Sequence, residues 1–196
     1  MGQAEIDSDG THGDGEPTSA AELAERAAQG ERFKYVYFWG HQPRRAGSVG
    51  AECFSQWFPS PFVVDRVTYA TAEHWMMAGK ARLFGDAEAE RRAIAASQPG
   101  QAKEIGRSVR GFDDAVWRER RFELVVRGSV EKFRQHPEMR DYLLSTGVRV
   151  LVEASPVDRI WGIGLSADDE RAAVPRQWEG QNLLGFALME ARRRLA

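Results

Sequence analysis

The chain has 196 residues, of which 42% are hydrophobic and 29% are charged, as expected of one soluble domain with a genuine core. Its 27 basic and 29 acidic side chains give a formal net charge of -2, so there is no electrostatic reason to expect duplex nucleic acid as a partner. A single cysteine, Cys53, excludes an intrachain disulfide and a thiolate metal cluster.

The first part of the chain differs in composition from the rest. Residues 1–18 contain almost no large apolar side chain, and such a segment cannot offset its own ordering entropy. We predict a disordered or weakly helical tail over residues 1–32, with a short alanine-rich helix at residues 20–29, and one domain over residues 33–196. No secretory signal and no membrane-spanning apolar stretch is visible, so we expect a cytoplasmic protein without a membrane partner.

The domain begins with a predicted strand at residues 35–39, which are β-branched and aromatic. A polar loop at residues 40–52 follows. Residues 62–64 and 67–69, hinged at Asp65 and Arg66, then predict a hairpin or one bent strand. One further strand is predicted at residues 149–153.

Helical periodicity and capping signals dominate the rest of the chain. We predict helices at residues 71–84, 87–96, 101–107, 113–135, 137–145 and 181–195. Thr71 is placed to cap the first of these helices, and Pro137 stands in a first turn, where proline is tolerated. The predicted fold class is therefore mainly α (α+β): a single helical domain with a small β-sheet component.

The helix at residues 71–84 carries a first candidate site. Positions seven apart on a helix point in nearly the same direction, so Glu73 and Lys80 share a face, with Met76 and Met77 between them. The helix dipole favours an ionised carboxylate at Glu73, which suits a base, a nucleophile or a stabiliser of positive charge. The alternative is ordinary helix design, with both methionines facing the core.

His74, in the same helix, could act as a metal ligand or a general base. No second histidine stands at a metal-ligand spacing, so a zinc site is not expected. Local packing or hydrogen bonding of His74 is favoured over catalysis.

The segment at residues 158–185 carries a second candidate site. It combines Trp161 and Trp178 with four glycines in a mostly non-helical stretch. Aromatic faces beside closely approachable backbone amides suit a pocket for a flat polar heterocycle. Alternatively, the tryptophans fill the core of a packed loop.

Two carboxylates, Glu153 and Asp158, stand next to this segment. Such a pair suits the cleavage of a glycosidic bond, in which one group stabilises an oxocarbenium-like centre and another handles protons. The alternatives are a turn or cap at Asp158 and a solvated strand end at Glu153. No dinucleotide fingerprint, P-loop or Gly-x-Ser-x-Gly elbow is present, which disfavours cofactor-dependent redox chemistry and phosphoryl transfer.

Five separate blocks of the sequence resemble the NADAR, or YbiA-like, family. They are FWGH at residues 38–41, FSQWFPS at 54–60, EHWMMAGKA at 73–81, DRIWGIG at 158–164 and QNLLGFALMEAR at 181–192. The resemblance runs from about residue 33 to the C-terminus and implies a small, mainly helical fold. It also implies cleavage of a bond between ribose C1 and a nitrogen, with no metal or organic cofactor.

The resemblance implies one of two substrates. Some members split ribose 5-phosphate from the aminopyrimidine of early riboflavin-pathway intermediates, and others remove ADP-ribose from guanine. Carried over by position, the family's motifs imply site residues on both candidate segments. The implied catalytic residues are Glu73, Lys80 and Asp158, and the implied substrate-binding residues are Trp39, Gln56, Trp57, His74, Trp161, Gly162 and Asn182.

Base recognition is expected from aromatic and amide side chains. Trp39, Trp57 or Trp161 would stack on the base, and Asn182 or Gln56 would hydrogen-bond its edge. The chain has Ser-Gln-Trp at residues 55–57 where many members have Ser-Asn-Phe, a departure that would alter base recognition while retaining an amide.

The catalytic side chains have alternative expected roles. Glu73 or Asp158 would stabilise positive charge at ribose C1 or orient the attacking water. Lys80 would either pair with the phosphate or attack C1 of an opened ribose as an amine of depressed pKa.

The leading hypothesis is an N-glycosidase that hydrolyses a phosphorylated ribosylaminopyrimidine to ribose 5-phosphate and the free base. One alternative is a glycohydrolase that removes ADP-ribose from guanine in nucleic acid. Another is a non-catalytic module that binds ADP-ribose or a related nucleotide. The near-neutral net charge favours a small-molecule substrate, because nucleic acid would benefit from a basic track.

Overall fold

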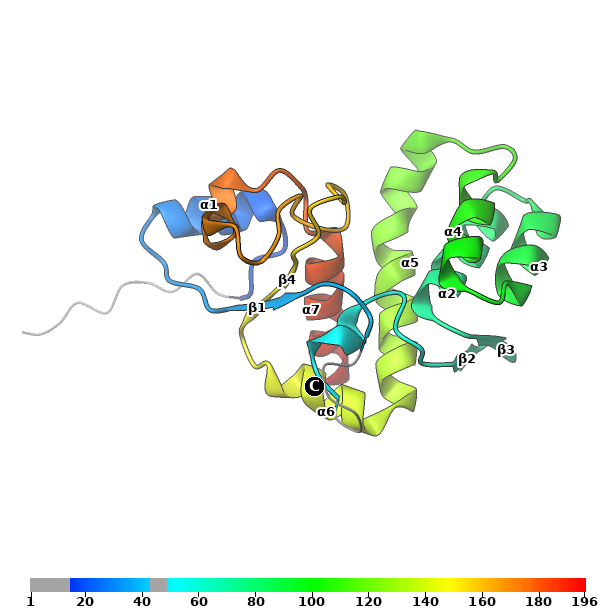
Figure 1. Cartoon of the computed structure of the whole chain (residues 1–196), viewed down its shortest axis with the longest axis horizontal. Coiled ribbons are helices and arrows are strands. Elements are labelled where there is room, and N and C mark those ends of the chain that lie inside the picture. Colours follow the sequence, from blue (N-terminus) through cyan, green and yellow to red (C-terminus); the bar gives the residue numbers. More distant parts are fainter. Residues whose placement is uncertain (1–14, 43–48) are drawn as a thin grey trace, which may run out of the picture.

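The computed structural model describes residues 15–42 and 49–196 (Figure 1). Residues 1–14 of the predicted tail and part of the predicted loop at residues 40–52 lie outside these ranges. The helix expected at residues 20–29 is confirmed as α1 (Ala20–Ala28). The hydroxyl of Ser19 caps its start, and its Leu23 is fully buried. α1 packs against a short 3-10 helix, η3 (Pro175–Gln177), which lies far along the chain.

The chain forms two small two-stranded sheets within the described ranges. β1 (Tyr35–Phe38) and β4 (Val150–Glu153) pair in parallel, with Phe38 opposite Glu153. Both strands were expected from the sequence, whereas their pairing with each other was not. This pairing fixes the end of β4, where Glu153 stands.

β2 (Phe62–Val64) and β3 (Val67–Tyr69) form the predicted hairpin. Asp65 and Arg66 both adopt positive φ, at 51° and 68°. Two consecutive residues of positive φ form the tight turn whose twist matches that of the flanking strands.

The helices make up most of the fold, as predicted. The longer ones are α2 (Ala72–Leu83), α3 (Ala87–Ala95), α4 (Pro99–Arg107), α5 (Asp114–Gln135), α6 (Pro137–Ser145) and α7 (Leu183–Leu195). Two further short 3-10 helices are η1 (Ala51–Phe54) and η2 (Glu170–Ala173). None of the helices in the described ranges has the length and apolar composition needed to cross a lipid bilayer.

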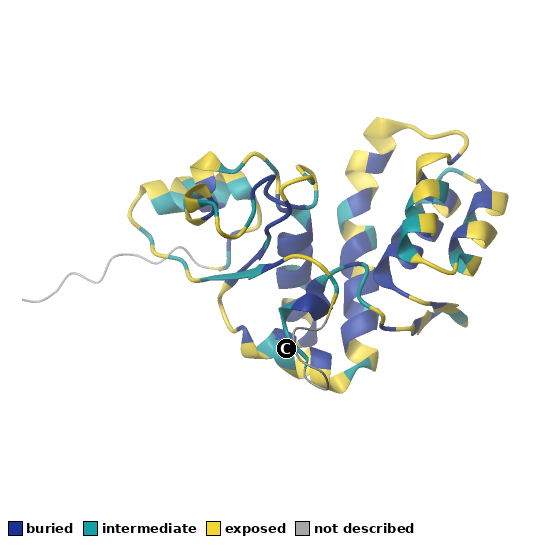
Figure 2. Ribbon diagram, in the orientation of Figure 1, coloured by how far each residue is buried: buried dark blue, intermediate teal, exposed yellow. Residues whose placement is uncertain are grey.

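The long helix α5 runs through the middle of the molecule (Figure 1). α2 and α7 both pack against it, and α3 and α4 cover α2. As a result, α2 is buried on nearly every side (Figure 2). A helix that is enclosed in this way carries its polar side chains into the interior, and Glu73 and His74 are among them.

α7 packs directly on β4, and Gly185 makes this close approach possible. A Cβ at Gly185 would lie 2.0 Å from the carbonyl oxygen of Leu151 in β4. No side chain can be accommodated at that separation, so the contact between helix and strand requires glycine.

The substitution Gly185→Ala tests this contact. The added Cβ must push α7 away from β4, so we expect the free energy of unfolding to fall by roughly 3 kcal/mol, measured by urea denaturation. Gly100→Ala in the first turn of α4 is the control, because the nearest atom to its added Cβ belongs to Trp57 and lies 3.6 Å away. Equal stability of both variants would show that α7 and β4 do not approach so closely.

Candidate active site

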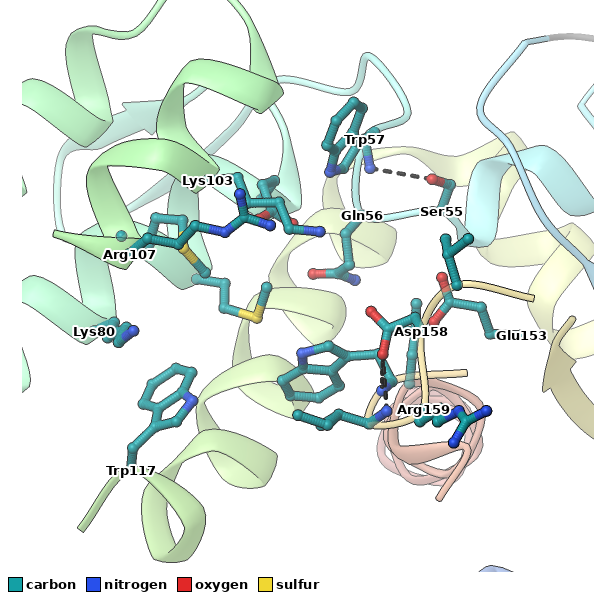
Figure 3. A pocket seen from close by; sticks show the side chains of 18 residues that line it. Ser55, Gln56, Trp57, Lys80, Lys103, Arg107, Trp117, Glu153, Asp158 and Arg159 are labelled. Atoms are coloured by element: carbon teal, nitrogen blue, oxygen red, sulfur yellow. Dashed lines mark hydrogen bonds between the residues drawn. The ribbon is translucent and has the colours of Figure 1, made fainter. Parts of the chain in front are cut away.

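A cavity of about 540 Å³ lies between the α2–α4 layer and the segment that joins β4 to α7 (Figure 3). This volume is within the range of about 300–1,000 Å³ that is usual for small-molecule sites. The lining comes from α2, α4, the start of α5, residues 55–57, the end of β4, residues 157–161 and the start of α7. The two candidate segments of the sequence therefore meet in one place.

Most of the expected site residues line this cavity. They are Gln56, Trp57, Glu73, Lys80, Asp158 and Trp161. The seven-residue spacing places Glu73 and Lys80 on one face of α2, as predicted, and both point to the same cavity as Trp161. Trp57 and Trp161 supply the aromatic walls that the sequence led us to expect.

Three polar atoms of lining residues are buried and have no hydrogen-bond partner among the described residues. They are Gln56 Nε2, Glu73 Oε1 and Glu153 Oε2. Leaving such an atom unpaired costs about 1–3 kcal/mol, so folded proteins seldom do so without a reason. One donor and two acceptors in one cavity are the groups that a polar ligand would satisfy.

Burial controls the protonation of Glu73, whose exposed fraction is only 3%. Desolvation raises its pKa to about 7, repulsion from Asp158 acts in the same direction, and attraction from Lys103 opposes both. The sequence predicted that the helix dipole favours an ionised Glu73; burial opposes this, so the ionised form predominates only above about pH 7. The dipole contributes about 0.3–1 kcal/mol, whereas burial can shift a pKa by several units of 1.36 kcal/mol each.

Glu153 carries the second carboxyl group of the cavity whose pKa is raised. The residue as a whole is half-buried, but its Oε2 is inaccessible to solvent. Desolvation raises its pKa to about 8, and repulsion from Asp158 and Glu73 adds to the effect. The protonation of Glu153 therefore depends in part on that of Glu73.

Asp158 has the turn role that the sequence offered as one alternative, and it also lines the cavity. Its Oδ1 accepts hydrogen bonds from the backbone N–H groups of Ile160 and Trp161, each at 2.8 Å, so it shapes the turn. It also lines the cavity, where its negative charge raises the pKa of Glu73 and Glu153.

Lys80 lies beside Trp117 and on the opposite side of the cavity from Glu153 and Asp158 (Figure 3). Its Nζ is 4.2 Å from the ring centre of Phe112 and 5.5 Å from that of Trp117. Burial lowers the pKa of its ammonium group, while attraction from an acidic neighbour partly opposes this. Lys80 thus places a positive charge at the end of the cavity away from those carboxylates.

Lys103, Arg107 and Trp117 also line the cavity and were not identified from the sequence. A signal was available for two of them. Lys103 and Arg107 are four residues apart in a predicted helix, so they share a face. Trp117 offered no such signal, because only the packing of α5 against α2 brings it to the cavity.

The structure does not place Trp39 or His74 in the cavity wall, contrary to their implied part in substrate binding, whereas the local hydrogen bonding that the sequence favoured for His74 is confirmed. Trp39 follows the end of β1 and is 58% exposed. His74 is buried: its Nδ1 hydrogen-bonds Thr71 Oγ1 at 2.8 Å, and its Nε2 hydrogen-bonds the carbonyl oxygen of Ala96 at 3.0 Å. Nε2 therefore joins α2 to the end of α3, whereas Nδ1 pairs with the Thr71 hydroxyl, which contacts His74 rather than capping the helix.

Gly162 and Asn182 also lie outside the cavity wall, contrary to expectation. A Cβ at Gly162 would lie 2.8 Å from the carbonyl oxygen of Glu153, so this glycine permits close packing. Asn182 is fully buried: its Oδ1 accepts from the N–H of Glu153 and its Nδ2 donates to the carbonyl oxygen of Leu151, both at 2.9 Å. Its amide pairs with β4 as another strand would and thereby holds Glu153 in position.

No group of three or more His, Cys, Asp or Glu side chains in the described ranges is arranged to hold a metal ion. The arrangement instead offers acid–base chemistry from two coupled carboxyl groups. Aromatic faces, one amide and several cations surround them.

Comparisons with known proteins agree on one family. The NADAR domain model matches residues 37–196. An N-glycosidase of Acanthamoeba polyphaga mimivirus is 41% identical over 167 residues, which are 83% of this chain and 96% of the viral protein. The chloroplastic riboflavin biosynthesis protein PYRR of Zea mays is 35% identical over 137 residues, which are 65% of this chain and 20% of the maize protein. The NMR structure of the E. coli protein YbiA matches with a TM-score of 0.66 and 27% identity, covering 84% of this chain and 86% of that chain.

The substitution Asn182→Asp tests the positioning of β4. It keeps the shape of the side chain but replaces the donor to the Leu151 carbonyl with an oxygen, so we expect a loss of roughly 1–3 kcal/mol in unfolding free energy. Denaturant titration measures the loss. Gln98→Glu, at an exposed amide without a capping hydrogen bond, is the matched control and should leave stability unchanged. Wild-type stability of Asn182→Asp would contradict the role given to this amide.

Proposed function

This chain belongs to the NADAR family, and we propose that it is an N-glycosidase that hydrolyses the bond between ribose C1 and a base nitrogen. The observation that carries the proposal is the pair of carboxyl groups on Glu73 and Glu153, each with a buried, unpartnered oxygen in one aromatic-walled cavity. Cleavage of a glycosidic bond needs one group that stabilises positive charge at C1 and another that handles protons. The name of the viral relative, an N-glycosidase, supports the same reaction.

The two carboxyl groups divide the work according to their pKa values. With pKa values raised to about 7 and about 8, the pair holds on the order of one proton near neutral pH. Glu153 donates this proton to the leaving nitrogen while the C1–N electron pair moves to the base. The Glu73 carboxylate stabilises the positive charge at C1 and takes a proton from the water that adds there. The products are the free base and a ribose with a C1 hydroxyl.

We further propose that the substrate is a phosphorylated ribosylaminopyrimidine, which yields ribose 5-phosphate. Trp57 and Trp161 provide faces on which a flat base can stack, and Gln56 Nε2 is a free donor for its edge. The maize relative is a riboflavin biosynthesis protein, which supports an aminopyrimidine.

Cations around the cavity support a phosphate on the sugar. Lys103 and Arg107 project from α4, and Lys80 projects from α2. Lys80 lies opposite Glu153 and Asp158, where a point charge would meet the phosphate rather than C1 (Figure 3). We therefore assign Lys80 to phosphate binding, and borohydride should trap no adduct between Lys80 and ribose.

The substrate is tested by incubating the purified protein with ribosylaminopyrimidine phosphate and, separately, with ADP-ribosylated guanosine. Chromatography should detect free base from the first compound. Release from the second alone would reassign the site to ADP-ribosyl guanine. Binding of either compound without release of base would contradict an N-glycosidase.

The pH dependence tests the roles of the two carboxyl groups. We expect kcat/KM to rise through about pH 7 as Glu73 ionises and to fall through about pH 8 as Glu153 loses its proton. Glu153→Gln should remove the alkaline limb and lower kcat by about 10²–10⁴-fold. Glu138→Gln, an exposed residue on α6, is the control and should keep the wild-type profile. An alkaline limb that persists in Glu153→Gln would contradict the assignment of the proton donor.

The pH dependence of the unfolding free energy shows whether Glu73→Gln loses activity because a catalytic group is missing or because the fold is damaged. A carboxyl group whose pKa is raised on folding binds protons more tightly in the folded state, so its contribution to stability falls as pH rises from 4.5 through about 7. Glu73→Gln removes this penalty. We expect the unfolding free energy of the variant, measured relative to that of wild type, to be higher at pH 8 than at pH 4 by on the order of 1–3 kcal/mol. Turnover should be lost. A difference in stability between variant and wild type that is the same at pH 4 and pH 8 would contradict the raised pKa.

A further inference from the structure

Lys132, on α5, is a buried cation that does not line the cavity. Its exposed fraction is 1%. Its Nζ donates hydrogen bonds to the backbone carbonyl oxygens of Cys53, at 2.7 Å, and Ser55, at 3.0 Å. The rings of Phe58 and Phe133 lie nearby, with centres 5.8 Å and 5.3 Å from Nζ. The ammonium group is thus surrounded by carbonyl dipoles and aromatic faces.

A lysine in such surroundings is costly, because burial disfavours its charged form. Desolvation lowers the pKa of Lys132 to about 8. The neutral amine still has two N–H groups, which match the two carbonyl oxygens. The hydrogen bonds of Lys132 therefore do not require its charge, which indicates that its contacts with the backbone are its main contribution.

The carbonyl groups that Lys132 holds belong to the segment that carries base-recognition side chains into the cavity. Ser55, Gln56 and Trp57 are consecutive lining residues. The Ser55 hydroxyl accepts a hydrogen bond from the N–H of Trp57 at 3.2 Å. The carbonyl oxygen of Gln56 accepts from the N–H of Glu73 at 2.9 Å, so the same segment also meets the start of α2.

We propose that Lys132 is a positioning residue for substrate recognition: by fixing the carbonyl groups of Cys53 and Ser55, it sets the direction in which Gln56 and Trp57 face the base. This proposal rests on the proposed function in one respect: the base that the segment recognises is taken to be an aminopyrimidine. Loss of these hydrogen bonds lets the segment move, which weakens binding of the base. The proposed proton donor, Glu153, stands on β4 and is not part of this segment, so we expect the larger effect on binding of the base rather than on the chemical step.

The substitution Lys132→Met tests the proposal, because methionine keeps the length and apolar stem of lysine without its donors. We expect KM for ribosylaminopyrimidine phosphate to rise about tenfold or more, with kcat within about twofold of wild type. Ser129→Ala is the matched control, since Ser129 lies one turn away on α5 and its buried hydroxyl has no partner among the described residues. The control should keep wild-type KM and kcat.

The possible outcomes separate positioning from mere stabilisation. A less stable Lys132→Met variant with wild-type KM would make Lys132 purely structural and would overturn the proposal, as would a fall in kcat with KM unchanged. If Lys132→Met does not fold, Lys132→Arg is measured instead, because it retains donors but displaces them. A raised KM with retained kcat is again the expected result, and wild-type KM again overturns the proposal.

The test also distinguishes this proposal from the proposed function. Calorimetric titration with the free aminopyrimidine measures recognition without turnover. If wild type shows no glycosidase activity, the proposed function fails, whereas weaker binding of the aminopyrimidine by Lys132→Met than by wild type still supports positioning. Equal affinity of wild type and Lys132→Met for the aminopyrimidine overturns the positioning role of Lys132.

Discussion

The burial of two carboxyl groups, those of Glu73 and Glu153, in the wall of one cavity is the constraint on which the rest of this structure depends. Glu73 comes from a helix enclosed on nearly every side, and Glu153 comes from the end of a strand far along the chain. Removing both from water is unfavourable, so the surrounding structure must hold them there. β4 is held by its parallel partner β1, by the Asn182 amide and by the close contact at Gly185. α2 is held by its packing against α3, α4 and α5.

The same constraint accounts for the distribution of charge around the cavity. Negative charge from Asp158 adds to the repulsion and raises the pKa of both glutamates, whereas Lys103 limits the rise. Lys80 stands apart, against Phe112 and Trp117. A substrate with a developing positive centre at one end and a phosphate at the other complements this pattern. This separation of carboxyl groups from Lys80 suits an N-glycosidase better than a tight ion pair would, because the positive charge at C1 arises only during the reaction.

Local signals in the sequence predicted local structure well, since turns, caps and helical periodicity depend on neighbouring residues. The hairpin at Asp65 and Arg66 and the shared face of Glu73 and Lys80 are examples. Asn182 shows where such signals fail: an amide before a helix can bind a ligand or hold a strand, and only the partners on β4 decide between them. The raised pKa of Glu73 was likewise hidden, because its cause is burial by helices that follow it in the chain.

The protonation of the two glutamates can be observed directly. Carbon-13 NMR of protein labelled at the glutamate carboxyl carbons, titrated from pH 4 to pH 9 and assigned with single glutamine variants, measures each group in turn. Two coupled titrations near pH 7 and pH 8 are predicted for Glu73 and Glu153. If both signals titrated near the ordinary value of 4.5, the cavity would hold two ordinary carboxylates and no proton donor at neutral pH.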